Sequence, residues 1–147
     1  MIRRMNDGRV EDHHRQILPF WYGLQAQAYA EVGRAEAGAV AVREALTLAE
    51  QNDERHGEAE LHRIGGDLLA ATGGDDAAVE AAFRRALDVA AAQRARAWTL
   101  RSAISLCRFL RARGRASEGR AVLAAARAEV GAGAREGDVV EADRLLG

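Results

Sequence analysis

The sequence of 147 residues is long enough to form one domain with a hydrophobic core, and its formal net charge of −1 argues against a general binder of polyanions. Hydrophobic residues make up 48% of the chain but aromatic residues only 5%, and much of the apolar content is alanine, the strongest helix former. Because strand-like alternation is absent and the one proline, Pro19, precedes most of the chain, the sequence predicts an all-α fold.

Composition also predicts the compartment. All 21 basic residues are arginine, which is typical of a GC-rich bacterial genome. The single cysteine, Cys107, excludes an internal disulfide, and its leucine-rich surroundings indicate a buried thiol in a reducing compartment. Neither an apolar signal-peptide core nor a run of about eighteen apolar residues is present, so we expect a cytoplasmic protein without a membrane span.

The chain begins with a polar stretch, residues 1–10, which we interpret as a flexible lead-in. Helical periodicity then continues over 11–147, which we expect to form a single domain of three helix pairs. The first pair, residues 11–53, is predicted to contain helices over Glu11–Val32 and Ala35–Gln51, with Gly33 ending the first of them.

The second pair, residues 55–93, contains the stretch around which the chain is organised, Glu58–Ala90. One apolar stripe runs through Leu61 and Leu68 and a second through Val79 and Phe83. Between the stripes lies TGGDD, in which glycine permits the positive φ of a helix end and aspartate caps the next helix. Two such stripes require neighbouring helices to cover them.

The third pair, residues 94–131, is predicted to contain helices over Arg94–Arg113 and Ser117–Val130. A Gly/Ala linker follows, and residues 138–146 are predicted to form a short C-terminal cap with Val139, Val140, Ala142, Leu145 and Leu146 facing inward.

The three pairs align with one another as repeats. The following positions correspond: Ala26, Gly65 and Cys107; Tyr29, Leu68 and Leu110; Gly38, Val79 and Gly119; Val42, Phe83 and Leu123. Small residues recur because only they fit where two helices cross closely, and large neighbours fill the adjacent space.

This pattern resembles the tetratricopeptide repeat, a helix pair with small residues at its crossing and a glycine-containing turn. The segments LPFWYGLQAQAYAEVGR, EAELHRIGGDLLA and EAAFRRALDVAAAQRARAWTLRSAISLCRFL are similar to the C-terminal repeat region of large bacterial regulators. Those regulators join a nucleotide-cyclase or DNA-binding (LuxR-type) module to an ATPase and a repeat array. The resemblance covers about residues 17 to 130 and implies a right-handed superhelical solenoid of about three helix pairs plus the cap.

The same resemblance implies a non-catalytic protein–protein interaction module in bacterial signalling or transcription regulation. No ATPase or cyclase module is matched, so no catalytic function carries over. The chain is either a free-standing relative or a detached C-terminal fragment of a larger regulatory ATPase.

The residues themselves also argue against an enzyme. A phosphate-binding loop of the GxxxxGK[ST] type is impossible without lysine, and no Ser–His–acid constellation can be assembled. Glu58 and His62 lie one helical turn apart, but two ligands fall short of a zinc site. We therefore expect no catalytic residue, metal or cofactor.

The arginines offer the best candidate for a binding site. In tetratricopeptide arrays the first helix of each pair lines the concave face, and Arg101, Arg108 and Arg111 share a face of such a helix. From the second pair, His62 and Gly66 are placed in the same groove with Arg63 at its edge, and the first pair contributes Gln27 and Glu31. One interpretation is a groove for a carboxylate tail or acidic peptide, which arginine binds bidentately. The other is a solvated basic face.

An aromatic cluster beside the proline allows a second kind of interaction. Phe20, Trp21 and Tyr22 either pack at the N-terminal end of the array or form an exposed end through which two copies associate. Nucleic-acid binding is disfavoured, because no aromatic residues are interleaved with the arginines on their face.

Overall fold

The computed structural model describes residues 21, 23–53, 55–131 and 133–147, and these residues form helices and turns without a strand. The expected all-α class is thus confirmed for the described part of the chain. The helices are α2 (Ala35–Gln51), α3 (Glu58–Ala71), α4 (Asp76–Ala92), α5 (Arg96–Ala112), α6 (Ala116–Glu129) and α7 (Glu136–Leu146). Residues 23–31, which precede α2, are also helical. The predicted lead-in, residues 1–10, lies outside the described residues.

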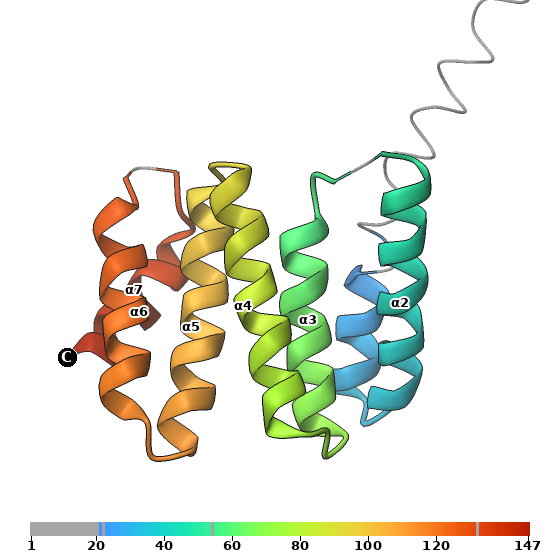
Figure 1. Cartoon of the computed structure of the whole chain (residues 1–147), viewed down its shortest axis with the longest axis horizontal. Helices are drawn as coiled ribbons and strands as arrows, with labels where there is room; N and C mark the ends of the chain where they lie inside the picture. Colours follow the sequence, from blue (N-terminus) through green and yellow to red (C-terminus); the bar gives the residue numbers. More distant parts are fainter. Residues whose placement is uncertain (1–20, 22, 54, 132) are drawn as a thin grey trace, which may run out of the picture.

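The helices lie side by side in a row (Figure 1). Helix α3 packs between α2 and α4, α4 packs against α5, and α5 against α6. Helix α7 leaves this row, crosses behind α5 and α6, and contacts both. Local contacts along the chain therefore account for most of the packing, and α3 also reaches α5.

Turns of one kind follow the helical segment 23–31, α3, α4 and α5. Gly33, Gly73 and Gly114 have φ values of +76°, +73° and +78°, as predicted for the helix ends at Gly33 and at the TGGDD segment. At each turn the next residue donates its N–H to a carbonyl five residues earlier, as Gly74 does to Leu69 at 2.8 Å. This is the Schellman arrangement, which satisfies carbonyls at a helix end. Arg94 occupies the same position after α4 with a φ of +54°, without being glycine.

The predicted close crossings occur in the first and third pairs. A Cβ atom on Gly38 would lie 2.9 Å from the carbonyl oxygen of Ala26, and one on Gly119 would lie 3.0 Å from that of Cys107. The repeat alignment pairs these positions, so the same contact recurs. The middle pair differs. A Cβ atom on Gly66 would lie 2.6 Å from the ring of Phe83 on α4. Gly66 thus lies under α4, and its predicted place in the groove is wrong.

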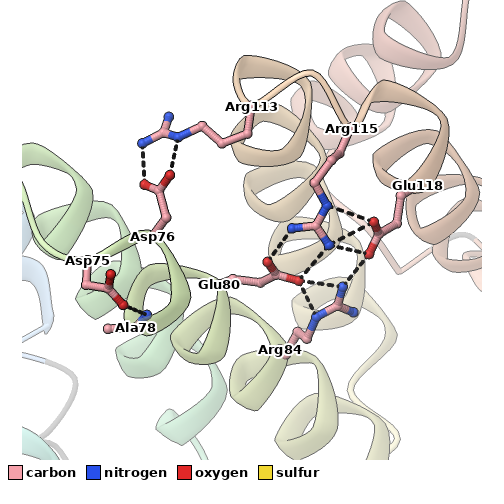
Figure 2. A network of polar contacts seen from close by, with 8 residues as sticks. All are labelled: Asp75, Asp76, Ala78, Glu80, Arg84, Arg113, Arg115 and Glu118. Atoms are coloured by element: carbon pink, nitrogen blue, oxygen red, sulfur yellow. Dashed lines mark hydrogen bonds and ion pairs between the residues drawn. The ribbon is translucent and has the colours of Figure 1, made fainter.

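Ion pairs join α4 to the following pair (Figure 2). Glu80 accepts hydrogen bonds from Arg84 and Arg115, and Glu118 accepts from the same two arginines. These hydrogen bonds lower the pKa of Glu80, with Arg115 as the main cause. Side chains of α4 therefore reach those at the start of α6.

Candidate interaction groove

A cleft of about 220 Å³ opens between the helical segment 23–31, α3 and α5. Its lining residues are Gly23, Leu24, Gln27, Gly57, Glu60, Leu61, Ile64, Trp98, Arg101 and Arg135. The first helix of each predicted pair contributes to it, together with the residue before α7. Of the predicted groove residues, the structure brings Gln27 and Arg101 together here.

The floor of the cleft is apolar. Leu61 and Ile64 of α3 are buried, since their period along the helix directs both toward the segment 23–31. Gly23 fits closely against them, because a Cβ at this position would lie 3.2 Å from Leu61 Cδ2. Leu24 stands at the edge with 43% of its surface exposed. The cleft is thus an apolar hollow open to solvent.

A carboxylate at the cleft holds two arginines. Glu60 accepts hydrogen bonds from Arg63 Nε and Nη2, both at 2.8 Å, and from Arg101 Nη1 at 2.9 Å. Arg63 is only 7% exposed and reaches Asp67 and Ser105 as well. Its charge is paired with Glu60 and Asp67 of the same helix, whereas the sequence analysis placed Arg63 at the edge of the groove.

Arg101 connects the cleft to α7. Its Nε lies 3.4 Å from Asp138 Oδ2, and its guanidinium carbon lies 5.6 Å from the centre of the Trp98 ring. The cation is therefore shared between two carboxylates and an aromatic face. Trp98 and Glu60 were missed as site residues, although a tryptophan one turn before Arg101 in an aromatic-poor chain was a usable signal.

The other two arginines of the predicted face lie outside the cleft. Arg108 donates to Glu141 of α7, so an acidic helix of the same chain covers this part of α5. Arg111 is exposed, and no ion pair to it occurs among the described residues. The sequence predicted α7 as an apolar cap, and one of its inward positions is wrong, because Val140 is 61% exposed.

His62 lines a different cleft, of about 290 Å³, between α2, α3 and α4. Its Nε2 lies 3.6 Å from Glu58 Oε1, and Arg85 also approaches this carboxylate. Burial is the main cause that lowers the pKa of His62 below its ordinary value. The prediction placed His62 in the same groove as Gln27. In the structure α3 directs the His62 side chain toward the cleft with α2 and α4, away from Gln27.

Trp21 is 61% exposed, whereas Phe20 and Tyr22 lie outside the described residues. Across the described ranges, no helix has the length and hydropathy of a membrane span. Nor do those ranges contain three or more His, Cys, Asp or Glu side chains grouped to hold a metal ion.

Comparison with protein-family models, curated proteins and solved structures finds no match to this chain. The described residues define its class as an all-helical protein with an open, apolar-floored cleft lined by the first helix of each pair.

Proposed function

We propose that the protein is a non-catalytic protein–protein interaction module built as a tetratricopeptide-like solenoid. The cleft between residues 23–31, α3 and α5 is the observation that carries this proposal, because three consecutive first helices line it. The repeated crossing at Gly38 and Gly119 supports the repeat architecture. By the sequence resemblance, the module belongs to a bacterial, cytoplasmic system of signalling or transcription regulation.

The chemistry of the cleft favours a peptide with one apolar side chain and a nearby carboxylate. Leu61 and Ile64 provide an apolar floor. Arg101 already has two carboxylate partners, so it contributes shape and polarity more than free charge. Arg135 is exposed at the rim and has no ion pair among the described residues, which suits an acidic group on the partner.

Peptides selected from a phage-displayed random library against the whole chain provide the probe. We expect their binding, measured by fluorescence anisotropy, to be lost in Leu24→Lys, because a charge at the edge opposes an apolar side chain. Val40→Lys is the matched control, since Val40 on α2 is 44% exposed but does not line the cleft.

Equal binding by Leu24→Lys and the unsubstituted chain would contradict the cleft as the binding site. Selected peptides that bind Val40→Lys more weakly than Leu24→Lys would likewise contradict it. Amide chemical shifts give a second readout, and we expect them to change at residues 60–64 and 98–101.

A second candidate is self-association through the N-terminal helical segment. Trp21 is among the most exposed large apolar residues, and Leu24, three residues later, is also exposed. If two copies associate there, light scattering will report a dimer that Trp21→Arg converts to a monomer. A monomer at every accessible concentration would exclude this candidate and leave the cleft proposal intact.

A further inference from the structure

Helix α7 contributes two buried side chains to the core between α5 and α6. Ala142 and Leu145 belong to the cluster that contains Leu100, Cys107 and Leu123. They lie three residues apart and therefore on one face of α7. The opposite face is solvated, as the exposure of Val140 and Arg144 indicates.

Charge complementarity fixes the orientation of α7 on this surface. Arg127 of α6 donates from Nε and Nη2 to the two oxygens of Asp143, at 2.8 and 3.2 Å. Arg108 donates from Nε and Nη2 to Glu141. With Arg101 beside Asp138, each arginine approaches a different carboxylate of α7. The surface under α7 thus has the chemistry of a receptor for an acidic amphipathic helix.

Several features make α7 an exchangeable occupant of this surface. Its ion pairs involve partly exposed side chains, and such pairs add little stability. Oδ2 of Asp138 accepts no hydrogen bond among the described residues, and the cation beside it, Arg101 Nε, lies 3.4 Å away, so this contact is a long ion pair. The segment between α6 and α7, here called the tether, includes Gly131 and Gly133. A Cβ atom added to either glycine would have no neighbouring atom within 4 Å.

We infer that the α5–α6 face is a second binding site, specific for acidic amphipathic helices of other chains, which α7 occupies and blocks in cis. The partner helix carries carboxylates with the spacing of Asp138, Glu141 and Asp143 and an apolar face like that of Ala142 and Leu145. This site and the cleft share Arg101, and Arg135, which directly precedes α7, lies at the rim of the cleft.

The tether determines how strongly α7 competes with a free helix for the α5–α6 face. A short covalent linker holds the segment that it joins at a roughly millimolar effective concentration, so a free helix competes poorly with an intact α7. Weakening the cis contact without touching the receptor surface removes this competition. Asp143→Arg does so, because it places like charges at Arg127 and leaves α5 and α6 unchanged.

The probe is a fluorescein-labelled peptide with the sequence of residues 134–147, and the readout is anisotropy with the full chain. We expect Asp143→Arg to bind it at least about tenfold more tightly than the unsubstituted chain does, as removal of a competing occupant predicts. Glu136→Arg is the matched control, because it makes the same charge change on α7 at an exposed residue outside these ion pairs. A peptide that itself carries Asp143→Arg should bind the variant chain weakly.

Equal peptide affinity in the unsubstituted chain and Asp143→Arg would overturn the inference, and so would equal binding of the two peptides. Circular dichroism supplies the remaining check. Global unfolding of Asp143→Arg would show that α7 is an inseparable part of the core and would also overturn it. None of these outcomes affects the cleft, whose test depends on Leu24.

Discussion

Arg63 and Glu60 form a buried two-point ion pair on α3, with Nε to Oε2 and Nη2 to Oε1 both at 2.8 Å. Glu60 lines the cleft and also accepts a hydrogen bond from Arg101 of α5. A carboxylate on one helix therefore joins two arginines whose positions in the sequence are far apart.

The first prediction concerns this pair. We expect Arg63→Met to lower the free energy of unfolding by about 2–4 kcal/mol, because Glu60 loses two hydrogen bonds while it stays largely buried. Urea denaturation of the full chain measures the change. Arg84→Met, which breaks a more exposed pair, should cost under about 1 kcal/mol. Equal effects of the two substitutions would show that burial does not govern the Arg63 pair.

The helix crossing in the third pair gives a second prediction. Gly119→Ala should destabilise the chain by about 1–3 kcal/mol, because its Cβ would lie 3.0 Å from the Cys107 carbonyl and 3.1 Å from its Cα. The thermal midpoint provides the measurement. Gly137→Ala on α7 meets nothing within 4 Å and should be neutral or stabilising by up to about 1 kcal/mol. A thermal midpoint for Gly119→Ala equal to that of the unsubstituted chain would mean that α5 and α6 can separate at no cost.

A third prediction follows from the turn after α4. Arg94 has a φ of +54° where three other turns use glycine. We expect Arg94→Gly to stabilise the chain by roughly 0.5–1 kcal/mol, since relief of left-handed strain exceeds the entropy cost of glycine. The reciprocal change, Gly114→Ala, should destabilise it by about 1 kcal/mol. Chemical denaturation tests both, and a loss of stability in Arg94→Gly would contradict the argument.

Acid should release α7 before the core unfolds. Hydrogen bonds from Arg144, which lies on α7 itself, and from Arg108 of α5 lower the pKa of Glu141 to about 2, from an ordinary value of 4.5. The bonds from Arg108 are the ones that join α7 to α5. Because the folded-state pKa is depressed, this contribution is complete above about pH 4.5 and is lost as the pH falls toward 2. Hydrogen bonding to Arg127 lowers the pKa of Asp143 in the same direction.

The methyl resonances of Leu145, followed by NMR between pH 6 and about pH 2, measure this release. Glu141→Gln removes the titrating group and should flatten much of the transition. An unchanged Leu145 environment across this range, in a chain whose circular dichroism remains native, would contradict the prediction.

Part of the candidate site was predictable from sequence. Helical periodicity placed Gln27 and Arg101 on first helices, and both line the cleft. The orientation of α3 was not predictable at the accuracy the site needs. A small rotation about a helix axis exchanges neighbouring residues between faces, so His62 and Gly66 were assigned to the wrong side.

The sequence by itself determined the all-helical class of the described residues, the limits of α2 (Ala35–Gln51) and the start of α4, because apolar period, glycine at positive φ and the Asp75 cap act within a few residues. The predicted limits of α5, α6 and α7 differ from the observed ones by up to two residues. Only the tertiary structure decided the partners of the charges. Glu60 with Arg101 and Glu141 with Arg108 are more than thirty residues apart. Such pairing depends on how whole helices cross and rotate, which long-range packing sets and local patterns do not encode.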